Sequence, residues 1–225
     1  DSGAFCSAQD ADSEGVEGKF FVWSHREVEE VLDKDEARIF CAAYDVTVAG
    51  NWEARNILNR PKPLRKVAEE LGTTRDELVA RLEPMKSKLF EHRRHRIAPG
   101  TDDKVITAWN GMMISGMAIT SRVLNEPKYA TAAARACDYI WTNMRKDNGR
   151  LFHTARHDKP TIDAFLDDYA CLIDGLIELY QTSFDENRLQ QAVELADIVL
   201  EDFCDESPGA YFYTPECQAT PTVRI

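Results

Sequence analysis

Apolar positions are densest between residues 101 and 124, and they lie on every face of the helix that this stretch would form. Two acidic residues, Asp102 and Asp103, open the run. A helix that is apolar nearly all round is buried on all sides. Three small residues lower its helix propensity, and we interpret them as points where neighbouring elements approach closely: Gly111, Ser115 and Gly116. The pattern predicts a buried central helix whose acidic end opens onto a shared space.

The same pattern recurs further along the chain. A shift of 64 residues places Asp167 on Asp103 and Gly175 on Gly111. Each apolar stretch is followed by an amphipathic segment with Ala, Val and Ile on one face, and then by a short β-prone stretch that starts with Gly. These β-prone stretches are residues 149–154 and 209–214, and a third copy is residues 18–23. The repeating unit is therefore an inner helix, an outer helix and a short strand.

Stacked units of this kind form a ring, because an apolar inner helix needs cover on both flanks. We predict an all-α fold, an incomplete α/α barrel with short strands between its helices, over residues 1–225. Residues 1–100 would hold early hairpins and loops, and residues 101–225 two clear repeats. The chain begins and ends as if within a domain, so we expect a part of a longer protein.

Local signals place the elements of the first hundred residues. Ser24, with Glu27 three residues later, is typical of a capping box. Gly72 should end one helix, Thr73 should cap the next, and Pro84 should kink it. The expected elements are a strand at 18–23 and helices within 24–33, 35–46, 63–72 and 73–96.

Charge and composition exclude several classes of function. A net charge of -12 and a pI near 4.9 disfavour binding to nucleic acid or to an anionic membrane. No apolar run reaches the length of a transmembrane helix and no signal peptide is recognisable, so we expect a cytoplasmic protein.

The six cysteines show no metal-binding spacing, and we expect reduced structural thiols: Cys6, Cys41, Cys137, Cys171, Cys204 and Cys217. Without a phosphate loop, nucleophile elbow or metal-ligand cluster, we expect no cofactor and no metal.

Three motifs carry a family resemblance that spans nearly the whole chain. SAQDADSEGVEGKFFVW, DDKVITAWNGMMIS and FLDDYACLIDGLIELY resemble the thioredoxin-domain family that includes spermatogenesis-associated protein 20. The resemblance implies a thioredoxin-like N-terminal domain, absent from this stretch, joined to an (α/α)6 barrel of the six-hairpin glycosidase type, similar to the sugar 2-epimerases. Gln9 and Cys6 depart from the family, which has an acidic and an aromatic residue there. A role that needs a carboxylate at Gln9 does not transfer.

Four aspartates are the candidate catalytic residues. Asp102 and Asp103, and Asp167 and Asp168, begin inner helices at equivalent repeat positions, so all four should approach one mouth of the barrel. Neighbouring helices pack about 8 to 10 Å apart, which matches the roughly 6.5 to 9.5 Å between the carboxyl groups of inverting glycosidases. One pair would supply the general acid and the other the base. The competing interpretation is that all four cap helices.

Further residues are assigned to a sugar pocket or the rim of the barrel. The loop DADSEG resembles the start of an EF-hand, but Phe21 stands where the bidentate Glu should be, so we interpret the loop as rim. Trp109 suits either a pocket or the core. The residues expected to bind substrate are Asp10, Asp12, Glu14, Trp109, Asn110 and Tyr169. His153 is a weaker candidate: epimerases of the similar fold use His for proton transfer, but Tyr213 takes its place in the next repeat.

These observations favour a carbohydrate-active protein that hydrolyses glycosides or epimerises or isomerises sugars. The competing hypothesis is a non-catalytic interaction module that works with the thioredoxin-like domain in redox or protein quality control. A carbohydrate ligand is the expected partner. We also expect homo-oligomers, because an incomplete ring leaves the apolar surface of its inner helices bare.

Overall fold

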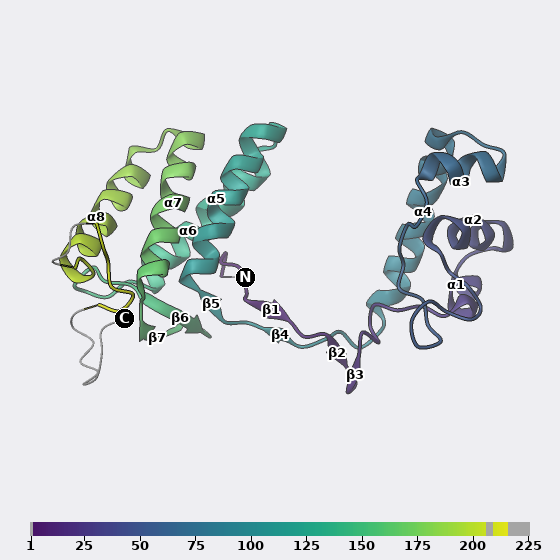
Figure 1. Ribbon diagram of the computed structural model, residues 1–225, viewed down its shortest axis with the longest axis horizontal. Coiled ribbons are helices and arrows are strands. Elements are labelled where there is room, and N and C mark those ends of the chain that lie inside the picture. Colours follow the sequence, from purple (N-terminus) through teal and green to yellow (C-terminus); the bar gives the residue numbers. More distant parts are fainter. Residues whose placement is uncertain (1, 206–208, 216–225) are drawn as a thin grey trace. The chain divides into compact units, whose positions relative to one another are not determined.

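The computed structural model describes residues 2–205 and 209–215 of the 225-residue chain. Two compact units are formed, each with its own apolar core (Figure 1). The small unit is Gln9–Thr101, and the repeat unit combines the residues up to Ala8 with those from Asp102 onwards. Strands β1 (Ala8–Gln9) and β4 (Thr101–Asp102) pair where the chain passes from one unit to the other.

Four helices build the small unit, and all were predicted. They are α1 (His25–Val31), α2 (Lys34–Tyr44), α3 (Leu64–Leu71) and α4 (Arg75–Arg94). Ser24 closes the expected capping box on α1, and Gly72 ends α3 in the left-handed conformation at φ 69°. Thr74, one residue after the predicted Thr73, caps α4. Helix α4 continues through Pro84 as one helix.

The strand predicted at residues 18–23 is wrong. Lys19–Phe21 form a turn, and only Trp23 pairs, through an isolated bridge to Asn56. Trp23 instead lies buried in the core of the small unit, with the guanidinium of Arg96 4.1 Å from its ring centroid. Of the aromatic residues that suggested a strand, Trp23 packs in the core, whereas Phe21 is exposed.

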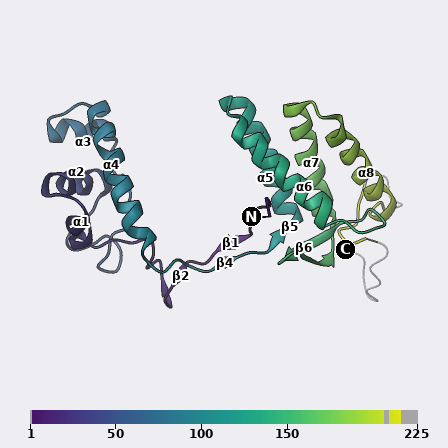
Figure 2. The ribbon, with the colours of Figure 1, turned by 180° about the vertical axis from the view of Figure 1, so that it is seen from behind.

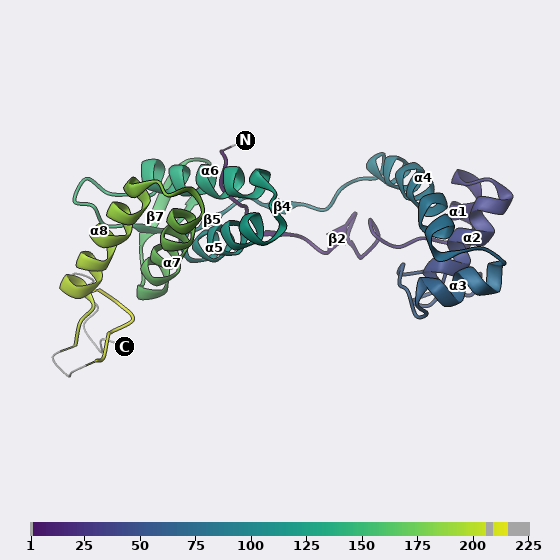
Figure 3. The ribbon, with the colours of Figure 1, turned by 90° about the horizontal axis from the view of Figure 1, so that it is seen from above.

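The repeat unit consists of two helical hairpins. Its helices are α5 (Thr107–Leu124), α6 (Pro127–Asn143), α7 (Leu166–Ser183) and α8 (Glu186–Asp202). Helices α5 and α7 lie side by side and run in the same direction, while α6 returns along α5 and α8 along α7 (Figures 1 and 2). Figure 3 shows the same four helices from above. The predicted all-α fold, with parallel inner helices and antiparallel partners, is confirmed. That residues 1–225 form one barrel domain stays a prediction.

A three-stranded antiparallel sheet lies at the N-terminal ends of α5 and α7 (Figure 1). Its order is β5 (Val105–Ile106), β6 (Phe152–Arg156) and β7 (Lys159–Asp163). Val105 pairs with Ala155, so the start of the first hairpin is tied to the strand that follows it.

The sequence repeat is visible in the backbone hydrogen bonds. The N–H of Phe152 donates to the carbonyl of Met144 at 2.9 Å, and that of Phe212 donates to the carbonyl of Phe203 at 2.7 Å. After each outer helix, the stretch that follows therefore turns back and hydrogen-bonds to the end of that helix. The repeat seen in the sequence is thus confirmed in three dimensions.

Two glycines set the distance between α5 and α7. A β-carbon on Gly111 would lie 2.5 Å from the carbonyl carbon of Cys171, and one on Gly175 would lie 2.8 Å from the carbonyl oxygen of Gly111. The backbones are in direct contact there, which confirms the interpretation of Gly111. Gly116 has open space around it, so the same interpretation was wrong for that residue.

The burial of the central helix on all sides was also wrong. Trp109 is 51% exposed and Val123 75% exposed, and Met112 and Met113 are exposed on the same helix. In the described residues, α6, α7 and the N-terminal segment cover the other sides of α5 and leave this face open.

Two further sequence expectations bear on the class of protein. Five cysteines in the described residues are free thiols, and Cys217 lies outside the described residues. Burial raises the pKa of the Cys137 thiol to about 11, as expected for a thiol that packs as a small apolar group. Among the described helices, none combines the length and the apolar character needed to cross a membrane.

We predict opposite effects for alanine at two glycines of α5. Gly111→Ala should lower the free energy of unfolding by roughly 2 kcal/mol, because its β-carbon collides with the backbone of α7. Gly116→Ala, on the same helix with no neighbour, should raise it by about 0.5 to 1 kcal/mol through helix propensity. Urea unfolding followed by circular dichroism measures both. Equal stability of the two variants would contradict the close contact.

Candidate functional site

A histidine and a buried aspartate meet where α5 and α7 begin. His153 lies on β6 and Asp168 in the first turn of α7. Nδ1 of His153 is 2.8 Å from Oδ2 of Asp168. The Asp168 side chain is 0% exposed, whereas that of His153 is 25% exposed. In the part of the chain that the structure describes, no hydrogen bond or ion pair engages Nε2 of this ring. A fixed ring with an open second nitrogen is the arrangement of a general base.

Asp168 also joins the two inner helices. Its Oδ1 accepts the N–H of Ala108 in the first turn of α5 at 2.9 Å, and its Oδ2 accepts the N–H of Phe165 at 2.9 Å. The N-cap residue of α5, Ile106, has no side chain that can accept a hydrogen bond from the start of the helix. A carboxylate from the neighbouring helix supplies that acceptor instead. Burial raises the pKa of Asp168, while the bonds from Phe165, His153 and Ala108 act against that rise.

Two aromatic rings extend the cluster. The ring of His153 meets that of Phe165 edge-on at 5.2 Å, and Tyr213 stacks on Phe165 at 5.1 Å with the planes 6° apart. Burial, together with Asp167, to which its hydroxyl is hydrogen-bonded, raises the pKa of Tyr213. His153 and Tyr213 are equivalent in the repeat, so both repeats bring a proton-carrying side chain onto one phenyl ring. We call His153, Phe165, Asp167, Asp168 and Tyr213 the helix-end cluster.

The other aspartate pair does not begin a helix, and that prediction was wrong. Asp102 ends β4 and Asp103 precedes β5, because Val105 and Ile106 pair with β6 and delay the start of α5 to Thr107. Lys104, 3.1 Å from Asp102, holds the pKa of that carboxyl below its usual value.

Asp103 belongs to a different cluster at the turn between β6 and β7. Its carboxylate lies 2.7 Å from Nε of Arg156 and 2.9 Å from Nε2 of His157. The hydrogen bond from Arg156 lowers the pKa of Asp103. Among the described residues, no hydrogen bond or ion pair links Asp102 or Asp103 to the aspartates of α7. The assignment of acid and base to these two pairs stays a prediction.

The residues proposed to bind substrate fall into three settings. Trp109 lies half exposed on α5. Asn110 is buried, and its amide accepts the N–H of Phe5 at 2.8 Å and donates to the carbonyl of Phe5 at 3.0 Å. Tyr169 is buried as well, and its hydroxyl accepts the N–H of Leu151 at 2.9 Å. The polar groups of Asn110 and Tyr169 are therefore engaged by the chain itself.

The DADSEG loop is a β-hairpin of the small unit. Strands β2 (Asp12–Ser13) and β3 (Val16–Glu17) flank a turn at Glu14 and Gly15, which have φ values of 53° and 73°. Asp10 accepts the N–H of Asp12, and Glu14 pairs with Lys19 at 2.8 Å. Within the described residues, no group of three or more His, Cys, Asp or Glu side chains is placed to hold a metal ion. The role of this loop as a rim stays a prediction.

The sequence pattern indicates His153 only as a weaker candidate and does not indicate Phe165 or Tyr213 as site residues. The sequence repeat contains the information that could have identified these residues. A shift of 60 residues pairs His153 with Tyr213, and the shift of 64 places a pair of aspartates at the start of α7. What was not visible in the sequence is that these two sets of residues meet.

Comparisons with known proteins identify relatives along nearly the whole chain. Spermatogenesis-associated protein 20 of Homo sapiens is 30% identical over 94% of this chain, and that of Rattus norvegicus is 30% identical over the same share. The chain is a homologue of these proteins. An uncharacterized protein of Caenorhabditis elegans is 30% identical over 99% of the chain. The chain spans about a third of the length of these relatives, 31% of the human protein and 34% of the nematode protein.

The resemblance to spermatogenesis-associated protein 20, predicted from three motifs, is thus confirmed. No family model matches the sequence. Among solved structures, cellobiose 2-epimerase from Bacillus thermoamylovorans B4167 is similar, with a TM-score of 0.45 and 12% sequence identity, over 64% of this chain and 43% of that one.

The pKa of Asp103 offers a test of the turn cluster. In NMR titrations its carboxyl should titrate below the ordinary Asp value of about 3.9, and Arg156→Gln should move it back toward that value. Because the folded pKa is the lower one, the stability that Asp103 contributes should be present above the unfolded value and lost as the pH falls through the folded value. Lys159→Gln, on the neighbouring strand, serves as control. An unchanged titration in Arg156→Gln would contradict the ion pair.

Proposed function

We propose that the chain belongs to a carbohydrate-active enzyme in which His153 carries protons to and from a sugar. The contact between His153 and the buried Asp168 supports this function more than any other observation. The carboxylate fixes which ring nitrogen holds the proton and leaves the other open, as a general acid and base requires. A sugar as substrate follows from the family resemblance of the motifs.

The helix-end cluster suits a sugar in a second way. Phe165 and Tyr213 present stacked rings beside His153, and aromatic faces pack against the C–H faces of sugar rings. The hydroxyl of Tyr213, with its raised pKa, stays protonated near neutral pH and donates its hydrogen bond to Asp167, so its oxygen can accept a hydrogen bond from a sugar hydroxyl.

Epimerisation or isomerisation fits the cluster better than hydrolysis. Hydrolysis by two carboxylates needs both to reach the glycosidic bond. Asp168 is completely buried behind His153, and Asp103 has a lowered pKa that makes it a poor acid at neutral pH. A single imidazole that moves a proton beside a carbonyl needs no second exposed carboxylate.

A second candidate is the non-catalytic interaction module. The observation that favours it is the exposed apolar face of α5, formed by Trp109, Met112, Met113 and Val123. Exposed apolar surface of this kind is typical of protein interfaces. Such a module would leave sugars unchanged, so the two candidates differ in one measurement.

That measurement is the exchange of sugar C–H protons with solvent. The protein is incubated in D₂O with a panel of aldoses, ketoses and disaccharides, and deuterium incorporation next to the carbonyl carbon is followed by NMR. We expect exchange with at least one sugar and a roughly 10² to 10⁴-fold loss in His153→Gln. His95→Gln, exposed in the small unit, is the control and should retain the activity. Absence of exchange with every sugar would leave the interaction module as the better account.

Asp168→Asn tests how much the hydrogen bonds to this carboxylate stabilise the fold. An amide offers one acceptor oxygen to three donors, so at least one buried N–H loses its partner and the unfolding free energy should fall by about 1 to 3 kcal/mol. Asp167→Asn, one residue away, should cost much less stability. Thermal unfolding measures both. Equal loss in the two variants would contradict the role given to Asp168.

A further inference from the structure

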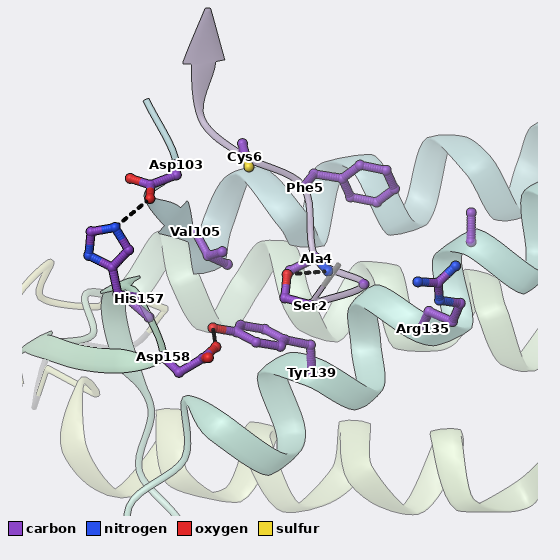
Figure 4. Close-up of a pocket in the computed structure, with 13 residues that line it drawn as sticks. Ser2, Ala4, Phe5, Cys6, Asp103, Val105, Arg135, Tyr139, His157 and Asp158 are labelled. Atoms are coloured by element: carbon purple, nitrogen blue, oxygen red, sulfur yellow. Dashed lines mark hydrogen bonds and ion pairs between the residues drawn. The ribbon is translucent and has the colours of Figure 1, made fainter. Parts of the chain in front are cut away.

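A second site lies apart from the helix-end cluster, in the same unit. It is a pocket of about 670 Å³ between the N-terminal segment Ser2–Cys6, helix α6 and the turn that joins β6 to β7 (Figure 4). That volume is within the range of small-molecule sites. Apolar residues form part of the wall, and its polar or charged side chains are Ser2, Asp103, Arg135, Tyr139, His157 and Asp158. None of the described residues that line it belongs to the helix-end cluster.

The polar side of the pocket is held in place by hydrogen bonds. The buried Tyr139 donates its hydroxyl to Asp158 at 2.9 Å, and His157 contacts Asp103 at 2.9 Å. His157 and Asp158 occupy the two central positions of the turn at φ 50° and 56°. Turns of this kind favour Asn and Gly, so His and Asp bear a conformational cost that Gly would avoid. The turn thus presents two functional side chains to the pocket.

The opposite wall is fixed as well. Phe5 is held by the two hydrogen bonds to Asn110 described above. Gly3, at φ 94°, packs against Arg135, where a β-carbon would come 3.3 Å from the Arg135 carbonyl oxygen. The N-terminal segment therefore lies close along α6 and closes the pocket on that side.

Charge separates the two ends of the pocket. The charge of Asp103 is compensated by Arg156, and its carboxylate also contacts His157. The guanidinium of Arg135, in contrast, forms no ion pair or hydrogen bond within the described residues. Figure 4 shows Arg135 at the end of the pocket away from His157 and Asp103, with Tyr139 between. An unpaired guanidinium is suited to a carboxylate or phosphate group, and the Tyr139–Asp158 pair to hydroxyl groups.

We propose that this pocket binds an anionic sugar, with the phosphate or carboxylate of the ligand on Arg135 and its hydroxyls on Tyr139, Asp158 and His157. The choice of a sugar rests on the proposed function. The preference for an anion rests on Arg135 and does not depend on the proposed function.

Isothermal titration calorimetry on the whole chain tests the proposal. Glucose 6-phosphate carries a phosphate and glucuronate a carboxylate, so the pair distinguishes the two kinds of anionic group. Glucose and inorganic phosphate are the controls, since each carries only the sugar or only the anion. We expect at least one anionic sugar to bind 10-fold or more tighter than either control. Equal affinity for glucose would overturn the anion preference, and equal affinity for inorganic phosphate would overturn the choice of a sugar.

Variants locate the site. Arg135→Gln should weaken binding of the anionic sugar about 10 to 100-fold, down to the affinity of glucose. Lys128→Gln removes the same charge from the same helix outside the pocket and should change nothing. Tyr139→Phe should weaken binding of the anionic sugar without affecting that of inorganic phosphate. Unchanged affinity in Arg135→Gln, with the fold intact by circular dichroism, would overturn the proposal.

His153→Gln separates this proposal from the proposed function. The variant should bind the anionic sugar with unchanged affinity, because His153 does not line the pocket. Binding without any deuterium exchange would reject the proposed reaction and support the pocket. Loss of binding in His153→Gln would show that the pocket is not a separate site.

Discussion

The direct backbone contact between α5 and α7 is the constraint on which the repeat unit depends. Gly111 and Gly175 allow it, since a β-carbon on either would lie within 3 Å of the other helix's backbone. Only at this separation can a short Asp side chain on α7 reach the first turn of α5. The bond from Ala108 to Asp168 is therefore a consequence of the glycine contact, and so is the position of the carboxylate that holds His153.

Asp168 consequently has two roles that one substitution cannot separate cleanly. It stabilises the start of a neighbouring helix and it orients an imidazole. The interpretation of the paired aspartates as helix caps holds for this residue, which accepts an N–H at the start of α5 as well as one at the start of its own helix, while its catalytic role stays a prediction. Buried carboxylates persist where several donors compensate them, and here three do.

Sequence periodicity predicted the helices and their pairing because both depend on patterns within one repeat. The shift that aligns Gly111 with Gly175 is a packing signal, and the structure uses it as one. The start of α5 was not predictable in the same way. Val105 and Ile106 continue the apolar pattern of the helix, yet they pair with Thr154 and Ala155, about fifty residues later. A partner so distant in sequence leaves no local trace. The same holds for Trp23 and for Asn110, whose amide is taken up by Phe5.

The repeat also relates two side chains of the helix-end cluster to each other. His153 and Tyr213 occupy equivalent positions, contact the same ring of Phe165, and are each hydrogen-bonded to one of two adjacent aspartates. An imidazole can accept or release a proton near neutral pH. A phenol whose pKa is raised keeps its proton there, and Tyr213 donates that proton in a hydrogen bond to Asp167. Repetition with this one difference places an imidazole with one open nitrogen and a phenol that keeps its proton on the same aromatic ring, each held by its own aspartate.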